Sequence, residues 1–548
     1  MYVFAFDHPH GVAPGRLAPL LGAKGAALAE MTSVLDLPVP PGFTITTDAG
    51  RVVAGGGWPD GLDDEIAEHV ARLEAAVGRR FGDPDEPLLV SVRSGADRSM
   101  PGMMDTVLDV GLGDRSVRGL ARRTGGERFA WDCYRRLIDG FSRVVIGIDV
   151  TSELGATEVD VDVDERRAGC ERALAAVAAR TGETFPQDPA QQLHRAIAAV
   201  FSSWGTPRAA AYRARQGIAD DPGTAVSVQT MVFGNRDDRS GTGVASTRDP
   251  STGEARPVGD FLVRAQGDDV VAGAHATDGL DGMAARFPER HAELLDVFAR
   301  LEAHHRDLCE VEFTIETDRL WVLQARIGTR TGAAALRMAV EMVDRPGWHL
   351  ARDEALLRVT GEHLRQVMRP GFDAGEAEVM VVGRPASPGA AVGQACFSAA
   401  AAIDAADRGD AVILVRAETS PEDVPAMGVA AGVLTATGGP ASHAAVVARG
   451  WGIPAVVGAA IHIDGEQFTA GGVTVEAGAL VSIDGSTGEV AVGARRRRPA
   501  GQDPALVTLL GWADDAVAER GGAPVGDDPA ARLAAAHRAL GLGPPSER

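Results

Sequence analysis

Between Gly432 and Gly450 the chain allows few folds other than a strand, a glycine turn and a helix. The apolar run Gly432–Thr435 predicts a buried strand, and Gly438-Gly439 after it favours a tight turn. A helix rich in alanine and valine follows, with His443 in its first turn and Gly450 as its stop signal. The pattern therefore predicts a histidine held at the N-terminus of a short helix.

A histidine in that position suits phosphoryl transfer. The free backbone N–H groups and the positive dipole end at a helix N-terminus favour an anion. That field keeps an imidazole neutral and nucleophilic, and it stabilises a phosphoryl group attached to the ring. For a single histidine, a capping or core role remains the alternative on these grounds alone. Upstream, Val412–Val415 predicts another buried strand, and Ser420–Asp423 predicts the start of a helix.

The charge of the chain limits its partners. Its net charge of −22 argues against nucleic acid or an anionic membrane surface as a partner, and it requires a local basic pocket for any polyphosphate. Among the 54 Lys and Arg residues, Lys24 is the only lysine. Arginine replaces lysine on a solvated surface, but not where a compact ammonium must fit between phosphate oxygens. Lys24 is either a chance survivor of an arginine-biased composition or functional, and its flanking glycines favour function.

Length and composition indicate a multidomain protein. The 548 residues suffice for about three to four domains. No apolar run reaches the ~18 residues of a membrane helix, and we expect no leader at the N-terminus because it lacks a basic region. We expect a cytoplasmic protein, because its four cysteines lie far apart and form neither a disulfide framework nor a zinc pattern; they are Cys133, Cys170, Cys309 and Cys396.

The chain divides into four segments by pattern. Residues 1–340 alternate helical and strand-like stretches in a mixed α/β and α+β order, and residues 341–378 predict a helical linker. A Gly/Ala/Val-rich β/α domain follows at 379–498, and residues 499–548 remain. In the first segment, Arg118–Phe141 and Asp188–Arg215 predict helices, and Leu88–Val92, Ala225–Val232 and Val311–Ile315 predict strands.

No P-loop or dinucleotide fingerprint is present in the sequence, so a nucleotide would need another scaffold. Leu21–Gly25 predicts a glycine-flanked loop before a helix that runs to Met31, where the backbone could approach a phosphate closely. Ser91–Gly95 follows a strand and leads into residues 99–106, a loop of small residues that could fold over a polyphosphate. Gly241–Gly243 predicts a turn that could cover a polyphosphate. Each of these loops alone is weak evidence.

A hairpin at Glu310–Arg326 offers stronger chemistry. Residues 309–316 alternate apolar and polar side chains, which predicts a half-buried strand, and Thr317–Arg319 predicts a three-residue hairpin loop. That register places Glu312 opposite Gln324, and Glu310 opposite Arg326. A carboxylate beside an amide oxygen suits Mg²⁺, and a neighbouring arginine can hold phosphate in a bidentate grip. A solvated polar face on an edge hairpin is the alternative.

Long ordered motifs in this sequence resemble the pyruvate, phosphate dikinase family. In the first segment they are GAKGAALAEM, LPVPPGFTITTDA, SVRSGADRSMPGMMDTVLDVGL, RFAWDCYRRLI, VQTMVFGN, SGTGVASTRDPSTGE and EFTIE…LWVLQARIGTRT. In the later domain they are SPGAAVGQA, VILVRAETSPEDV, GG-x-x-SHAAVVARG-x-GIPAVVG and SIDGSTGEV, which are similar to phosphohistidine domains. The resemblance implies an ATP-grasp domain at 1–340 followed by a swivelling phosphohistidine domain at 379–498.

The resemblance also implies roles for individual residues. His443 would carry the phosphoryl group, while Lys24 and Arg93 would contact the ATP phosphates. Arg135 would belong to the same phosphate pocket, although the adjacent Arg136 leaves that choice open. The hairpin would supply ATP ligands at Glu312, Gln324 and Arg326, of which Glu312 and Gln324 would also bind Mg²⁺. The sequence departs from the family at Ala23, Glu310 and Ala441, where the family has glycine, often aspartate, and commonly threonine.

The family also contains a pyruvate-binding barrel of ~250 residues, and we expect that residues 499–548 are only a remnant of its entry segment. The implied enzyme phosphorylates His443 from ATP, with inorganic phosphate as a further reactant. It then passes the phosphoryl group to a small molecule or to a barrel protein in trans. The alternatives are a degenerate ATP-binding regulatory protein and an antibiotic-type dikinase, for which residues 341–378 are too few to form an acceptor domain. The resemblance allows a homodimer.

Overall fold

We describe the fold from a computed structural model of the chain. It covers residues 1–12, 16–97, 100, 104–155, 162–219, 223–272, 277–345, 350–368, 371–372, 379–439, 442–498, 503–523 and 525–541. Contacts between Cα atoms divide the chain into two compact units. The first comprises residues 1–242, 263–266 and 313–325, and the second comprises residues 243–262, 267–312 and 326–548.

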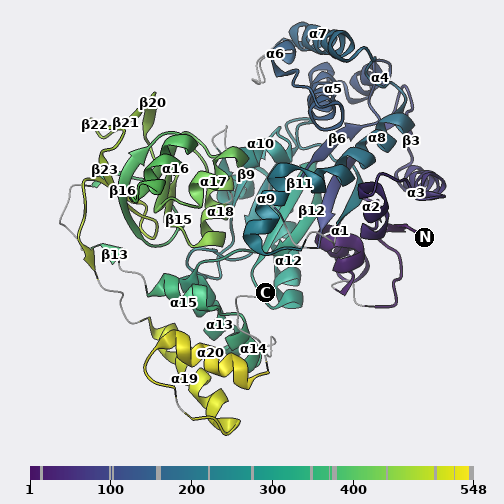
Figure 1. Cartoon of the computed structure of the whole chain (residues 1–548). Helices are drawn as coiled ribbons and strands as arrows, with labels where there is room; N and C mark the ends of the chain where they lie inside the picture. The colour runs from purple at the N-terminus through teal and green to yellow at the C-terminus, as the bar shows by residue number, and fades with distance from the viewer. Residues whose placement is uncertain are drawn as a thin grey trace. The chain divides into compact units, whose positions relative to one another are not determined.

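The first unit is built on an antiparallel sheet of the order β1-β2-β7-β5-β6. Its edge strand β6 is labelled in Figure 1. Its strands are β1 (Val3–Ala5), β2 (Gly42–Ile45), β5 (Val90–Ala96), β6 (Thr106–Val110) and β7 (Thr224–Thr230). Apolar side chains of β5 and β7 share one core with helices α5 (Glu127–Phe141) and α8 (Pro189–Ser202), because each strand and each helix buries an apolar face. This sheet carries the Arg93 motif.

Helices and two short strands accompany this sheet in the first unit. The long helices are α1 (Ala18–Ser33), α3 (Leu62–Val77), α5 (Glu127–Phe141), α7 (Val163–Thr181) and α8 (Pro189–Ser202). The shorter elements are α2 (Thr47–Ala54), β3 (Arg80–Phe81), β4 (Pro87–Leu88), α4 (Ser116–Thr124), the π-helix η2 (Ser142–Ile146), α6 (Thr151–Leu154), the 3₁₀-helix η3 (Ser203–Gly205) and α9 (Pro207–Gln216).

A second five-stranded sheet has the order β10-β9-β8-β11-β12. Its strands are β8 (Gly241–Ser246), β9 (Val258–Val263), β10 (Asp278–Gly279), β11 (Cys309–Glu316) and β12 (Arg319–Ile327). The helices α10 (Gly267–Ala272), α11 (Leu280–Arg286) and α12 (Pro288–His305) belong to the same stretch of chain. Strand β8 contains Gly241–Gly243, so the turn predicted there is wrong: these residues form a buried strand.

The second unit contains an eight-stranded sheet of the order β14-β24-β23-β16-β17-β18-β19-β15. Strands β16, β17, β18 and β19 pair in parallel, and the flanking pairs are antiparallel. The bounds are β14 (Val379–Val382), β15 (Arg384–Ser387), β16 (Ala390–Cys396), β17 (Val412–Arg416), β18 (Gly432–Thr435), β19 (Ala455–Val457), β23 (Leu480–Asp484) and β24 (Glu489–Val492). The strands predicted at 412–415 and 432–435 are confirmed.

Short helices accompany this sheet. They are α16 (Ala399–Asp407), the 3₁₀-helix η4 (Pro421–Asp423), α17 (Val424–Met427) and α18 (His443–Trp451). A three-stranded antiparallel sheet consists of β20 (His462–Asp464), β21 (Gln467–Ala470) and β22 (Val473–Glu476). The helix start predicted at Ser420 is confirmed. Ser420 is the N-cap of η4, Pro421 is its first residue, and Ser420 and Asp423 form a capping box.

Five helices of the second unit share a separate apolar core. They are α13 (Gly332–Asp344), α14 (Arg352–Leu357), α15 (Gly361–Val367), α19 (Pro504–Glu519) and α20 (Pro529–Ala539). The described part of the predicted linker 341–378 is therefore helical, except for the short strand β13 (Gly371–Phe372), which pairs with β25 (Arg497–Arg498). Helices from before and after the eight-stranded sheet thus form one helical bundle.

Two helical predictions are wrong in length, because glycine and proline interrupt them. The stretch 118–141 contains two helices, α4 and α5, separated at Gly125, whose φ is 67°. The stretch 188–215 also contains two helices, since α8 ends before Gly205 and α9 begins with Pro207. The predicted multidomain α/β and α+β class is confirmed. Within the described residues, no helix is long and apolar enough to cross a membrane.

Candidate functional site

His443 is the first residue of helix α18. The Ser442 side chain caps the helix and accepts a hydrogen bond from the backbone N–H of Ala445 at 3.4 Å. The helix continues through Gly450 and ends at Gly452, whose φ is 64°, so the predicted stop at Gly450 is wrong by two residues. The residue that ends this helix is in the left-handed conformation, which glycine adopts at low cost.

The two ring nitrogens of His443 have different surroundings. Nδ1 lies 3.1 Å from Oγ1 of Thr419, which is buried. Nε2 is buried and has no hydrogen-bond partner among the residues that the structure describes. Burial lowers the pKa of His443 below its ordinary value, while the nearby carboxylates of Asp423 and Glu422 act in the opposite direction. The imidazole is therefore biased toward the neutral form, with one nitrogen held and the other available.

The fold of the parallel strands places Thr419 beside the histidine. Strands β17 and β18 are parallel neighbours, and Thr419 and His443 each follow one of them. The loop after β17 is fixed by the buried carboxylate of Asp423, which accepts from the Ser420 backbone N–H at 3.0 Å and lies 3.2 Å from Nε of Arg416. Thr419 was not among the predicted site residues, although it follows the predicted strand Val412–Val415 at its carboxyl end, which was a usable signal.

The loop before α18 approaches strand β9 within the second unit. Gly438 has a φ of 102°, which a side chain would strain. A Cβ atom added to Gly439 would lie 2.4 Å from Oδ2 of Asp260, so a larger residue there would force the Asp260 side chain or the loop to move. The buried Asp260 carboxylate also accepts a hydrogen bond from Oγ1 of Thr277 at 2.7 Å and lies 3.6 Å from Nη1 of Arg384.

Lys24 lies in helix α1 rather than in the predicted loop before it. The helix is kinked at Gly22, whose φ of 68° and ψ of 163° are not helical, and Lys24 lies just beyond the kink. A Cβ atom on Gly22 would lie 1.7 Å from the carbonyl oxygen of Gly95. The structure therefore brings the Lys24 motif directly against the strand that carries Arg93, within the first unit.

Arg93 lies inside strand β5, which extends beyond the strand predicted at Leu88–Val92. It pairs with Thr106 on one side and with Ser227 on the other. Its side chain is half-buried. The segment after it, at residues 98–99 and 101–103, lies outside the described residues, as does Ala441 before the histidine.

Arg135 belongs to a buried cluster of arginines around one carboxylate. Asp132 accepts from Nε of Arg136 at 3.0 Å and from Nη1 of Arg166 at 3.1 Å, and Nε of Arg135 lies 3.6 Å away. Asn235 donates to the same carboxylate at 3.0 Å. Burial raises the pKa of Asp132, but the three positive charges outweigh it and the pKa is lowered. Three guanidinium groups therefore surround one carboxylate, which makes the cluster attractive to a further anion.

The hairpin β11–β12 differs from the prediction at its tip. Thr317 and Asp318 both have positive φ, so the loop has two residues in a type I′ geometry, and β12 begins at Arg319. The strand is also more buried than predicted, because Glu310 and Thr314 are covered. The predicted pairing of Glu310 with Arg326 is supported by their ion pair and by the 3.2 Å hydrogen bond from Nε of Arg326.

The remaining predicted ligands lie on the same two strands. Glu312 is half-buried on β11 and Gln324 is half-buried on β12. Their placement opposite each other stays a prediction. The candidate residues Lys24, Arg93, Arg135 and Gln324 belong to the first unit, whereas Glu312, Arg326 and His443 belong to the second.

Comparison with known proteins gives two domain matches. Residues 52–281 match the AMP/ATP-binding domain of pyruvate phosphate dikinase, and residues 409–488 match the mobile domain of PEP-utilising enzymes. The second match contains both His443 and Thr419, and the first contains Arg93 and Arg135.

Curated relatives agree with the domain matches. The chain is 45% identical over 533 residues to the chloroplastic pyruvate, phosphate dikinase of Flaveria bidentis, a match that covers 94% of this chain and 56% of that protein. It is 44% identical over 515 residues to the enzyme of Clostridium symbiosum, with 90% and 59% covered. The enzyme of Rhizobium meliloti is 45% identical over 529 residues, with 90% and 58% covered. The chain thus spans a little over half the length of these relatives.

Proposed function

We propose that this polypeptide is an ATP-dependent phosphotransferase of the pyruvate, phosphate dikinase type, and that it phosphorylates His443 from ATP. The observation that carries the proposal is the ring of His443 at the start of α18, with Nδ1 beside Thr419 and Nε2 without a partner among the described residues. A phosphoryl group on that nitrogen would lie at the N-terminal end of a helix, where backbone N–H groups and the helix dipole favour an anion.

The hydrogen bond to Thr419 selects the reactive nitrogen. A neutral imidazole carries its proton on one nitrogen and a lone pair on the other. If Nδ1–H donates to Oγ1 of Thr419, the lone pair is on Nε2, which can then attack phosphorus. Burial supports this state because it lowers the pKa of the ring. The loop oxygen thus acts as a positioning group for the nucleophile.

We assign the ATP phosphates to the basic residues of the candidate site. Lys24 and Arg93 would bind them, because the kink at Gly22 places the Lys24 motif against strand β5. Arg135 would bind phosphate from its buried cluster, and Arg326 would do so from the hairpin. Within the described residues of the first unit, this arginine cluster concentrates positive charge that an overall acidic chain otherwise lacks.

Glu312 and Gln324 would hold Mg²⁺. A carboxylate and an amide oxygen are donors that this cation accepts, and both side chains are half-buried on strands of one sheet. When bound, the cation would neutralise charge on the transferred phosphoryl oxygens. Glu312 and Gln324 would also orient the ATP phosphates toward attack.

Two phosphoryl acceptors are required if the nucleotide product is AMP. Conversion of ATP to AMP breaks two phosphoanhydride bonds, and the names of the relatives point to phosphate as one acceptor. We propose that one phosphoryl group forms a bond to Nε2 of His443 and that the other forms pyrophosphate with inorganic phosphate. The domain at residues 379–498, with its phosphorylated His443, would then act as a mobile carrier. It would deliver the phosphoryl group to pyruvate on a barrel, in the same or another chain, or to another small molecule.

Isotope exchange tests this assignment. With ³²P-labelled AMP, the chain should exchange label into ATP only when phosphate and pyrophosphate are both present. Parallel incubations with β- and γ-labelled ATP show which phosphoryl group the histidine takes. A chain that binds ATP but supports no exchange and takes up neither label would be the catalytically degenerate regulatory protein instead.

A further inference from the structure

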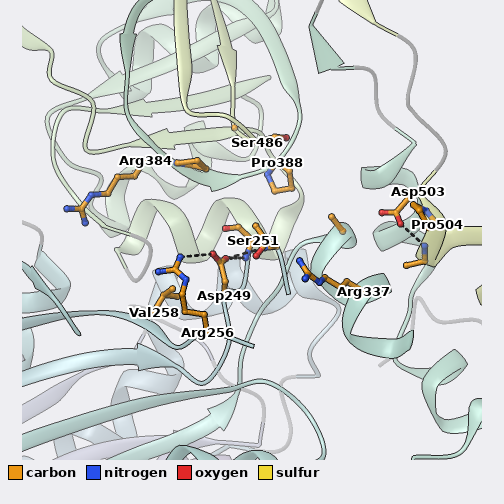
Figure 2. A pocket seen from close by; sticks show the side chains of 15 residues that line it. Asp249, Ser251, Arg256, Val258, Arg337, Arg384, Pro388, Ser486, Asp503 and Pro504 are labelled. Atoms are coloured by element: carbon orange, nitrogen blue, oxygen red, sulfur yellow. Dashed lines mark hydrogen bonds and ion pairs between the residues drawn. The ribbon is translucent and has the colours of Figure 1, made fainter. Parts of the chain in front are cut away.

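The second unit contains a cavity of about 790 Å³ that none of the residues assigned above to ATP, metal or phosphoryl transfer lines. Its volume lies in the range of small-molecule sites, which is roughly 300–1,000 Å³. The lining comes from the loop after β8, from β9 and α13, from β15 and the turn between β23 and β24, and from the first residues of α19. Figure 2 shows Arg384, Pro388 and Ser486 on one side and Asp249, Ser251 and Arg256 on the other.

Three arginines give this cavity its chemistry. The Arg337 guanidinium is held by ion pairs to Glu341 at 2.8 Å and to Glu254 at 3.2 Å. The other two have looser ion pairs: Nη2 of Arg256 lies 3.9 Å from Asp249, and Nη1 of Arg384 lies 3.6 Å from Asp260. Both distances exceed that of a hydrogen bond. Arg256 and Arg384 therefore have donors to offer to a ligand oxyanion.

The two acids in the lining are already engaged by the backbone. The Asp249 carboxylate accepts hydrogen bonds from the N–H groups of Ser251 at 2.8 Å and Thr252 at 3.2 Å. Asp503 caps helix α19 and accepts from the N–H of Ala505 at 2.8 Å. Because each carboxylate is held by N–H groups of its own loop, it has less capacity to neutralise the arginines across the cavity.

The rest of the lining is compact and apolar. It consists mainly of proline, alanine and valine side chains, with glycine and three hydroxyl-bearing residues, Ser251, Thr252 and Ser486. Such a surface suits a flat or compact hydrocarbon body, while the arginines suit a charged group attached to it. Arg256 and Arg384 come from opposite sides of the cavity (Figure 2).

We propose that this cavity is a second binding site, separate from the nucleotide site, for a small organic anion whose phosphate or carboxylate group is held by Arg256 and Arg384. Proline and alanine side chains would pack against the body of the ligand. A bound anion would join the loop after β8 to strand β15. It would thereby link the part of the second unit that precedes residue 340 to the sheet that carries His443.

Calorimetric titration of the full chain, without ATP, tests the proposal with two probes and a comparator. Phenyl phosphate and benzoate carry the two oxyanions on the same ring, and phenol carries neither. We expect at least one anion to bind more tightly than phenol, and the tighter one identifies the preferred oxyanion. The variant R256Q/R384Q should weaken that binding by about tenfold or more.

The control is R365Q/R408Q, which removes the same charge from two arginines that are 65% and 64% exposed and do not line the cavity. It should bind the anion as the unaltered chain does, and both double variants should unfold at the same temperature. Equal affinity of R256Q/R384Q and the unaltered chain would overturn the proposal, as would the absence of binding by both anions. Neither result depends on phosphoryl transfer, so the proposed function is tested separately.

Discussion

At the scale of single residues, the side chain most dependent on its exact chemistry is Lys24. It is the only lysine, and it lies beyond a kink in α1 that presses Gly22 against the backbone of Gly95. An ammonium group fits between phosphate oxygens in a way that the larger planar guanidinium does not.

We therefore expect K24R to lower ATP affinity or the rate of His443 phosphorylation by about tenfold or more, which is about 1.4 kcal/mol. Nucleotide titration and label uptake measure the two effects. As the sole side-chain amine that acylating reagents can modify, Lys24 should also be protected by ATP. If K24R binds and uses ATP as the unaltered chain does, Lys24 has no role at the phosphates.

A second prediction for a single residue concerns Thr419. T419V keeps the shape of the side chain but removes the oxygen beside Nδ1 of His443, so the ring loses its orientation and its preferred tautomer. We expect the phosphorylation rate to fall roughly tenfold, as for one lost hydrogen bond, with ATP affinity unchanged. The matched control is T437V, since the Thr437 hydroxyl donates to Ala417 and not to the ring. Equal rates for T419V and T437V would contradict the positioning role.

At the scale of elements, the glycine loop before α18 has a defined neighbour. In G439A the new Cβ would lie 2.4 Å from the Asp260 carboxylate, so the Asp260 side chain, the loop or strand β9 must shift. Overpacking of this kind costs about 1–3 kcal/mol, and we expect slower phosphorylation of His443. The double variant G439A/D260G should recover part of the loss, because it removes the clashing side chain. Failure of D260G to restore any activity to G439A would show that the clash is not the cause.

Some helices and turns could be predicted from sequence patterns, and others could not. The unit β18–turn–α18 was predictable because its apolar run, paired glycines and cap follow one another directly. The single helix expected at 118–141 was wrong because Gly125 and Gly126 break an otherwise continuous helical pattern. The hairpin loop was off by one residue, since both Thr317 and Asp318 adopt positive φ, which non-glycine residues rarely do.

Contacts between distant segments were not predicted from the sequence. The Thr419–His443 hydrogen bond joins loops 24 residues apart, and it depends on two strands being parallel neighbours. The cluster around Asp132 depends on a helix more than 30 residues away that supplies Arg166. The resemblance to a family identified Arg135, but it did not identify the Asp132 carboxylate that lies beside it. Tertiary placement, rather than local pattern, determines these contacts.

At the scale of the whole molecule, the helical bundle ties two distant parts of the chain together. Helices α19 and α20 bury apolar side chains against α13, α14 and α15. We expect L509A to destabilise the bundle by about 2–5 kcal/mol, because Leu509 is fully buried there. V507A is the control in the same helix, since Val507 is 60% exposed. Thermal unfolding measures both, and equal melting temperatures would contradict the shared core.

The central claim is that Nε2 of His443 receives a phosphoryl group from ATP. The most direct measurement is the uptake of label from β- and γ-³²P-ATP by the unaltered chain and by H443N, followed by treatment with acid and with base. We predict label on the unaltered chain that is lost in acid and stable in base, and none on H443N. Acid-labile, base-stable label on H443N would contradict the account.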